Sequence, residues 1–374
     1  MIAHGRPTLA DPITSRDFGI DFYDGIAIGN TTQVGMGGAG AALVTGSAGS
    51  LLNPAAPAIR ASTDHGRWEW DYHLDALTAK LSTDYDNNGV QTTGDGGASF
   101  LTFGLSIRAG KWGIAGTYTI EDAPLVGSSP LLDAQAVRGR FVVARWFAET
   151  DISLGFGVQQ VAFDVNESER SLFSIAGTGA MIGATWVPNL QRFRIGASYE
   201  TPILGAAVKT AGCDPMDCRG YILPGEVESS GRVIAGAAYR FGPTAWNQLV
   251  LGPFRDERAV TVAADVLVTD RTPNGYGLEA FGMQELQRSG RHVAVSVRGG
   301  VDYELEPGKL RLRAGSYWEP ARFDDVSGRL HVTAGADLRV FSFHFFGPRR
   351  LRLSATGDVA ARYRNIGISV GFWH

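Results

Sequence analysis

The chain has 374 residues but no run of the roughly 18 consecutive apolar residues that a membrane-spanning helix needs. This absence excludes a helical membrane protein. It does not exclude a transmembrane β-barrel, because every second residue of a barrel strand can be polar. Residues 1–16 also lack the apolar run of a signal peptide. A barrel needs such a leader for export, so we expect the leader to lie upstream of this sequence.

Signatures of enzymes and metalloproteins are missing as well. The seven histidines are scattered, without an H-E-x-x-H motif or paired metal-ligand spacing, and no G-x-S-x-G motif is present. We therefore expect no enzyme activity, no metal and no cofactor. The net charge is -4, with both signs spread along the chain. This argues against a nucleic-acid partner, which would require a basic face.

Cysteine is scarce, with Cys213 and Cys218 as the only two. A lone C-x4-C spacing, without histidine or further cysteines nearby, is a weak metal signal. A small loop disulfide in an oxidising compartment is the favoured interpretation.

Strict alternation of apolar and polar residues is abundant. Residues 66–80 place an apolar set on one face of a strand (Trp68, Trp70, Tyr72, Leu74, Ala76) and a polar set on the other (Glu69, Asp71, His73, Asp75). The same pattern recurs at 292–303, 330–340, 351–359 and 366–372. Glycine makes up 49 residues, about 13% of the chain against a usual ~7%. A glycine-rich composition with this period favours strands over helices.

The alternation predicts fourteen strands, at 67–80, 98–109, 111–121, 135–148, 151–165, 171–187, 191–201, 230–241, 258–269, 291–305, 309–319, 329–345, 349–359 and 363–373. Most exceed the ~5–6 residues of soluble strands and suit a tilted membrane crossing. Long connections at 81–97, 122–134, 202–229 and 270–290 alternate with short turns, although 242–257 is long where a short turn is expected. Outer-membrane barrels have long outer loops and short periplasmic turns. We therefore expect an all-β, 14-stranded antiparallel transmembrane barrel in the bacterial outer membrane, with both termini on the periplasmic side.

A segment rich in small residues precedes the first strand. Residues 24–62 contain the run Gly35-Met36-Gly37-Gly38-Ala39-Gly40 and end close to Asn53-Pro54-Ala55. The run lacks the G-x-x-x-x-G-K-[ST] pattern and the βαβ context of a nucleotide loop. Small residues allow close backbone packing, so we expect a compact plug inside the barrel. The chain then divides into an N-terminal periplasmic extension (1–23), a hatch (24–62) and the barrel (63–374).

The hatch motif resembles that of the FadL-type outer-membrane transporters of long-chain fatty acids and other hydrophobic compounds. The resemblance rests on residues 35–42, 47–50 and Asn53-Pro54-Ala55, and more weakly on barrel segments 223–239, 298–303 and 312–317. It implies a 14-stranded barrel plugged by the hatch. It also implies that the hatch residues Gly35, Gly37, Gly38, Gly40, Asn53, Pro54 and Ala55 take part in gating.

The leading functional hypothesis is passive, hatch-gated passage of hydrophobic small molecules such as long-chain fatty acids. Apolar residues of the long loops are candidates for a ligand groove: Leu125, Val126, Leu131, Leu132, Ile203, Leu204, Ile222 and Leu223. The same residues could equally be ordinary loop packing. Expected partners are outer-membrane lipid, the hydrophobic ligand and, during biogenesis, the barrel-assembly machinery.

Two alternatives remain. A related branch with the same hatch motif serves protein secretion, so the barrel could be an anchor or adapter with a secretion-complex partner. A general porin for polar solutes is the other alternative.

Overall fold

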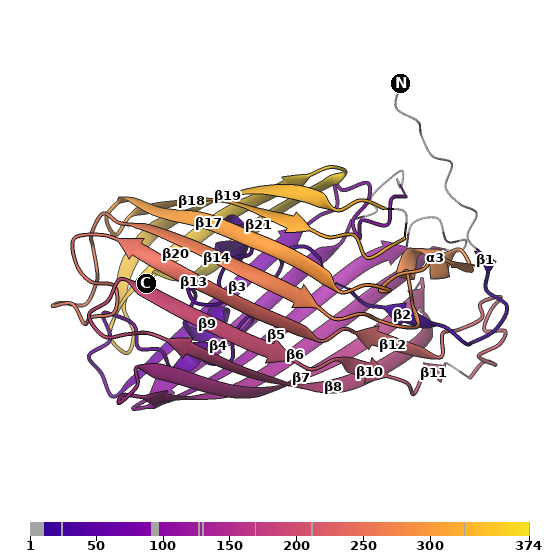
Figure 1. Cartoon of the computed structure of the whole chain (residues 1–374), viewed down its shortest axis with the longest axis horizontal. Coiled ribbons are helices and arrows are strands. Elements are labelled where there is room, and N and C mark those ends of the chain that lie inside the picture. Colours follow the sequence, from indigo (N-terminus) through magenta and orange to yellow (C-terminus); the bar gives the residue numbers. More distant parts are fainter. Residues whose placement is uncertain are drawn as a thin grey trace, which may run out of the picture.

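The computed structural model describes residues 11–23, 25–90, 97–125, 128, 131–168, 170–210, 212–324 and 326–373. Fourteen antiparallel strands form a closed barrel (Figure 1). The first barrel strand pairs with the last, and β8 pairs with β9, so the barrel has no free edge. The strands are β3 (Trp68–Thr78), β4 (Ser99–Ala109), β5 (Trp112–Leu125), β6 (Leu132–Phe147), β7 (Ile152–Glu167), β8 (Arg170–Trp186), β9 (Phe193–Glu200), β13 (Arg232–Phe241), β14 (Val260–Thr269), β17 (Ala294–Glu306), β18 (Leu310–Glu319), β19 (Arg329–His344), β20 (Pro348–Ala360) and β21 (Tyr363–Phe372).

All fourteen predicted strands are present, and the largest difference concerns the second long connection. The pairing of β5 with β6 continues to Leu125 and Leu132, so the loop between them spans 126–131 instead of the predicted 122–134. Both leucines are buried at the long-loop end of the barrel. Their burial explains why the ladder extends beyond the expected strand ends.

The predicted faces of the strands are confirmed. Leu74 on β3 is 42% exposed on the outer wall, whereas its neighbour Asp75 is 1% exposed and points into the lumen. On β17, Val295 is exposed and Ser296 is buried. A closed sheet with an apolar outer wall satisfies every strand's backbone hydrogen bonds internally, which is the condition for crossing hydrocarbon.

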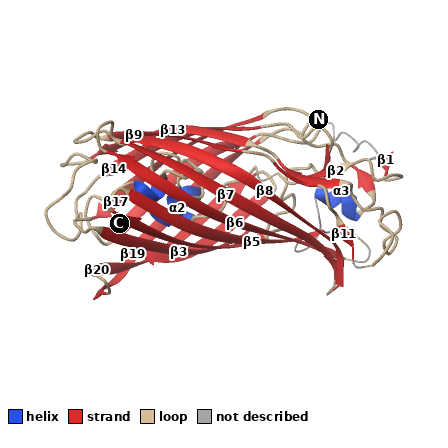
Figure 2. Cartoon of the chain, turned by 90° about the horizontal axis from the view of Figure 1, so that it is seen from below, coloured by secondary structure: helices blue, strands red, loops and turns tan. Residues whose placement is uncertain are grey.

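The small-residue segment lies in the lumen, where Asp75 and Asp265 of the wall contact it. It forms α1 (Thr31–Gly35), α2 (Gly46–Gly49) and the 3-10 turn η1 (Ala56–Ala58), and the short helices are visible inside the barrel in Figure 2. Asn30 caps α1 by accepting a hydrogen bond from the Thr32 N–H at 2.9 Å. The described part of the hatch is residues 25–62. No helix in the described part of the chain is long and apolar enough to span a membrane.

The N-terminal segment corrects one expectation. Residues 11–23 lie at the long-loop end of the barrel, not at the short-turn end where the 1–23 extension was expected (Figure 1). There β2 (Gly19–Asp21) inserts in parallel between β12 (Glu226–Ser229) and β15 (Gly275–Tyr276) of two long loops. Phe18, Ile20 and Phe22 are buried in the apolar cluster of these loops, which explains the placement. The chain then descends through the lumen, so that β3 starts and β21 ends at the short-turn end.

Other short elements complete the long-loop end. They are β1 (Asp11–Pro12) paired with β16 (Glu285–Leu286), β10 (Ile203–Gly205) paired with β12, β11 (Lys209–Thr210) added to β8, and α3 (Leu278–Gly282).

The unexpectedly long connection 242–257 packs against the short-turn end. The Asn247 amide donates to the carbonyls of Pro188 and Phe193 at 3.0 and 2.8 Å, and the Val250 N–H donates to the Ser62 carbonyl at 2.9 Å. This connection therefore contacts both the short turn around Pro188 and the end of the hatch.

The outer-wall assignment predicts a depth-dependent cost for a charge. Val301 lies in the middle of β17 and is 41% exposed, whereas Val293 lies just before that strand. Val301→Arg should lower the free energy of unfolding by about 2–4 kcal/mol, and Val293→Arg by about 1 kcal/mol or less. Urea unfolding in lipid bilayers measures both, and equal costs would contradict the assignment.

Candidate functional site: the hatch and the outer pocket

Two lumenal carboxylates hold the hatch through its backbone. Asp75 on β3 accepts from the Thr31 N–H at 2.8 Å and from the Asn30 amide at 3.0 Å. On the opposite side of the barrel, one oxygen of Asp265 on β14 accepts from the N–H groups of Gly40 and Ala41 at 2.7 and 2.9 Å. Buried backbone donors need acceptors, and these carboxylates supply them at the first residue of α1 and at Gly40 and Ala41 after it, where no partner within a helix is available.

Asn53 joins the hatch to itself and to the wall. Its Nδ2 lies 3.1 Å from the Ala41 carbonyl, 3.0 Å from the Ala184 carbonyl and 3.0 Å from Thr185 Oγ1, while its Oδ1 accepts from the Ala55 N–H at 3.0 Å. The side chain is fully buried. The Asn53 amide therefore contacts both the segment around Ala41 and strand β8.

Wall glycines let the end of the hatch lie directly on the sheet. A β-carbon at Gly155 would collide with the Pro54 carbonyl, and one at Gly183 would collide with Asn53 Oδ1. The Ser153 hydroxyl donates to the Ala55 carbonyl at 2.7 Å beside them. The part of the hatch that carries Asn53-Pro54-Ala55 is therefore in backbone contact with β7 and β8.

The glycine run packs against the opposite wall. Gly37 has a φ of +62°, and its N–H donates to Thr333 Oγ1 at 3.0 Å. A β-carbon there would lie 2.6 Å from the Gly299 carbonyl oxygen of β17. Both the backbone conformation and the space require glycine at this position. Gly35 and Gly38 adjoin the same wall, and Gly40 faces Asp265.

A line of polar groups links the hatch to the long-loop end. The Ala27 N–H donates to the Tyr317 hydroxyl at 3.1 Å, and that hydroxyl donates to Asp358 at 2.6 Å. His331 lies between Asp358 (2.8 Å from Nδ1) and Glu319 (2.7 Å from Nε2). Both ring nitrogens face carboxylate oxygens, which suits a doubly protonated imidazole.

The line continues from Glu319 into the first long loop. Glu319 accepts from Arg329, whose other nitrogens donate to the carbonyls of Asp84 and Tyr85 at 2.7 and 2.9 Å. The hatch and the outer loops are therefore connected through the barrel wall.

Most other charges in the lumen are paired with one another. Arg313 binds both Asp302 and Asp337, each at 2.7 Å, and Arg232 binds Glu200 at 2.8 Å. These ion pairs neutralise charges of the wall with each other, whereas Asp75 and Asp265 bind the hatch. Sequence patterns indicate only that such residues point inward.

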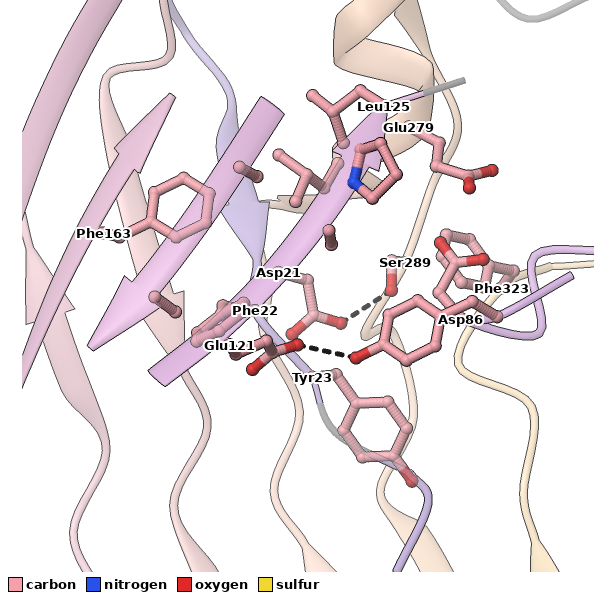
Figure 3. A pocket seen from close by; sticks show the side chains of 16 residues that line it. Asp21, Phe22, Tyr23, Asp86, Glu121, Leu125, Phe163, Glu279, Ser289 and Phe323 are labelled. Atoms are coloured by element: carbon pink, nitrogen blue, oxygen red, sulfur yellow. Dashed lines mark hydrogen bonds between the residues drawn. The ribbon is translucent and has the colours of Figure 1, made fainter. Parts of the chain in front are cut away.

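A pocket lies beneath the outer loops, between the N-terminal segment and the wall (Figure 3). Its apolar surface comes from Phe22, Tyr23, Leu125, Phe163 and Phe323, with further contributions from Tyr85, Leu278 and the alanines of β5 and β6. Four carboxylates also line it: Asp21, Asp86, Glu121 and Glu279. We call it the outer pocket. Its volume is about 50 Å³, well below the ~150 Å³ of a protein cavity known to hold benzene. The outer pocket is therefore too small to hold a benzene-sized molecule in this structure.

Two of these carboxylates titrate abnormally. Burial raises the pKa of Glu279 to about 7, and nearby Asp84 adds to the effect. The pKa of Asp86 is also raised, by burial and by the negative charges of Glu279 and Asp84. The Asn88 amide, which donates to Glu279 at 2.7 Å, partly offsets the effect on Glu279.

The predicted ligand residues form a packed cluster and not an open groove. Leu125, Leu132, Ile203 and Leu223 are buried around Phe18, Ile20 and Phe22 of the N-terminal segment, and Ile222 packs against the same cluster. Leu131 and Leu204 are exposed. Val126 lies outside the described residues. Only Leu125 lines the outer pocket, because the N-terminal segment fills the space expected for a ligand.

Sequence reasoning missed the aromatic and acidic lining of the outer pocket. The alternation of Phe18, Ile20 and Phe22 could have marked the N-terminal segment as a buried strand. The carboxylates of Asp86 and Glu279 come from separate loops, and no local pattern joins them.

Cys213 and Cys218 form a disulfide, as the spacing suggested, with their Cα atoms 5.1 Å apart. Among the described residues, no group of three histidine, cysteine or acidic side chains is arranged to hold a metal.

Comparisons with known proteins find the fold but no close relative. No protein-family model and no curated protein matches the sequence. Solved structures do match. The toluene transporter TodX of Pseudomonas putida is 14% identical with a TM-score of 0.54, over 96% of this chain and 99% of that one. The CymD monoaromatic hydrocarbon channel is 14% identical with a TM-score of 0.56, over 94% and 97%. A Pseudomonas aeruginosa FadL homologue is 13% identical with a TM-score of 0.51, over 93% and 98%.

The chain is thus a transmembrane β-barrel of the bacterial outer membrane, defined by its closed fourteen-stranded sheet and apolar outer wall. Its particular fold is that of the FadL-type channels, which confirms at the level of fold the resemblance found in the hatch motif.

Loss of the Asn53 amide should loosen the hatch without unfolding the barrel. Asn53→Ala leaves the Ala55 N–H and the Ala184 carbonyl without this partner, at a cost of about 1–3 kcal/mol. Faster deuterium exchange within 35–57, with unchanged exchange in the barrel strands, is the expected result. Asn189→Ala, in an exposed turn, serves as the control. Equal exchange in both variants would show that Asn53 does not hold the hatch.

The outer loops should open more readily as pH rises. Glu279 in its folded site has a pKa near 7, above the ordinary 4.5 of an exposed glutamate. Protonation of Glu279 therefore stabilises the folded outer loops fully below about pH 4.5, and this stabilisation is lost as pH rises through 7. Asp84 strengthens the effect at Glu279, and Glu279 and Asp84 likewise raise the pKa of Asp86, where Arg329 opposes them.

Deuterium exchange at 278–282, corrected for intrinsic rates, should increase between pH 5 and pH 8. Glu279→Gln should largely remove this dependence. A pH dependence that persists in the variant would assign it to another group.

Proposed function

We propose that the protein is a passive channel for hydrophobic small molecules, which enter through the outer pocket and pass once the hatch moves. The observation that carries the proposal is that the outer pocket and the hatch lie one after the other in the same lumen. An apolar pocket lies under the outer loops, and beyond it a hatch is held by discrete polar contacts. Apolar molecules are hindered by a charged outer leaflet, and a lined pocket removes them from water.

The way in which the hatch is attached favours a hatch that can move over one that closes the lumen permanently. Most of its attachments to the wall described above are one or two hydrogen bonds each to Asp75, Asp265, Thr333 and Ser153, rather than a continuous ladder. Each net contribution is about 1 kcal/mol, or somewhat more to a carboxylate. Such contacts can break in sequence while the barrel ladder stays intact.

The comparisons agree with this proposal. TodX is a toluene transporter, CymD is a monoaromatic hydrocarbon channel, and both match nearly the whole chain in fold. A general porin fits less well, because the hatch contacts opposite walls of the lumen, at β3, β8, β14 and β19.

A reversible cross-link between hatch and wall tests the proposal. A β-carbon at Gly35 lies 3.4 Å from the Arg313 Cβ, close to the ~3.5–4.5 Å span of a disulfide. The double variant Gly35→Cys/Arg313→Cys should therefore lock α1 to β18 when oxidised.

The measurement is the rate at which uncharged pyrene enters cells that carry the variant in their outer membrane. Oxidation should slow entry several-fold, and reduction should restore it. The two single variants and the unaltered chain, which retains Cys213–Cys218, control for the reductant. Equal rates in the oxidised and reduced double variant would remove the hatch from the mechanism.

A further inference from the structure

The outer pocket combines apolar walls with an excess of negative charge. Four carboxylates line it, and no lysine, arginine or histidine occurs among its described lining residues. Figure 3 shows Asp21, Glu121 and Glu279 around a space that is otherwise bounded by rings such as Phe163 and Phe323. A pocket for purely apolar molecules has no evident need for this charge.

The neighbouring cations are already engaged. Asp21 is held by Arg322 at 3.1 and 3.2 Å and by the Ser289 hydroxyl at 2.6 Å. Arg362 pairs with Asp84 outside the pocket at 2.8 Å. Asp21 is thus neutralised, and its charge contributes little to the excess.

Asp86 and Glu279 supply the remaining charge once they lose their protons, and an ammonium group beside them would favour that loss because an opposite charge lowers the pKa of a carboxyl group. Glu279 is 7% exposed, and its hydrogen bond comes from Asn88, a neutral amide. In the described part of the chain, neither Asp86 nor Glu279 has a cationic side chain within ion-pair distance. Two carboxylates near each other, and shielded from water, disfavour a further anion strongly and favour a cation. The Glu121 carboxylate, which accepts from the Tyr85 hydroxyl at 2.6 Å, adds to the negative side.

The surrounding rings suit the same ligand. Phe22 and Tyr23 already lie against the guanidinium groups of Arg138 and Arg322, which are 4.3 and 4.7 Å from the ring centres. Tyr85, Phe163 and Phe323 also contribute rings to the lining. Aromatic faces attract cations as well as apolar groups, and the attraction grows when water is excluded.

We infer that the outer pocket selects apolar molecules that carry a protonated amine and rejects those that carry a carboxylate. This inference rests on the proposed passage of hydrophobic molecules through the pocket and names their class. An ammonium group would pair with Glu279 and Asp86 while the apolar body lies against the rings. A fatty-acid carboxylate would instead face like charges.

A matched series of soluble ligands tests the inference. Phenethylamine, phenethyl alcohol and phenylacetate share one aromatic body and differ in the charge of the polar end. Calorimetric titration of the purified barrel at neutral pH should give the amine at least about tenfold tighter binding than phenylacetate, with the alcohol between them. Glu279→Gln should weaken the amine several-fold and leave the alcohol unchanged. Glu285→Gln, in the same long loop but outside the pocket lining, should change neither.

Results that contradict the inference can be told apart from results that contradict the proposed passage. Phenylacetate that binds as tightly as the amine, or an order of affinities that Glu279→Gln leaves intact, would overturn the inference while pyrene entry still tests passage. Binding of the alcohol as tight as that of the amine would also overturn it. If none of the three compounds bound, the pocket would not be a ligand site of this class.

Discussion

Closure of the sheet is the constraint on which the rest of the molecule depends. In hydrocarbon, an unpaired backbone group costs several kcal/mol, so the pairing of β21 with β3 and of β8 with β9 must hold throughout. The closed sheet fixes which residues face inward. That geometry in turn places Asp75 and Asp265 on opposite walls, where they can bind the backbone of the hatch.

The lumen is filled by a segment with little regular structure of its own. Small residues let it lie against the wall, and at Gly155 and Gly183 the wall itself lacks side chains where Asn53 and Pro54 approach. The fit is therefore a property of both surfaces. Polar contacts then determine how firmly each part of the hatch is held, independently of barrel stability.

The barrel could be predicted from sequence because its signal is local. Alternation along residues 66–80 defines two faces without knowledge of any neighbour, and the fourteen strands follow from such segments. The hatch motif likewise lies within one stretch of chain. The outer pocket could not be predicted, because it brings together Asp21, Glu121 and Glu279 from three distant segments. The position of the N-terminal segment was missed for the same reason, since β2 is held by two loops more than 200 residues away.

The polar line through His331 couples the position of the outer loops to the position of the hatch. Displacement of Asp84 and Tyr85 at the outer end removes two carbonyl acceptors from Arg329, which is otherwise bound to Glu319. Glu319 and Asp358 grip the same imidazole, and Asp358 fixes the hydroxyl that receives the Ala27 N–H. A displacement of the outer loops can thus reach the hatch through side chains of three adjacent strands, while the backbone hydrogen bonds of those strands stay in place. The rigid wall serves as the linkage, and no hinge is required within it.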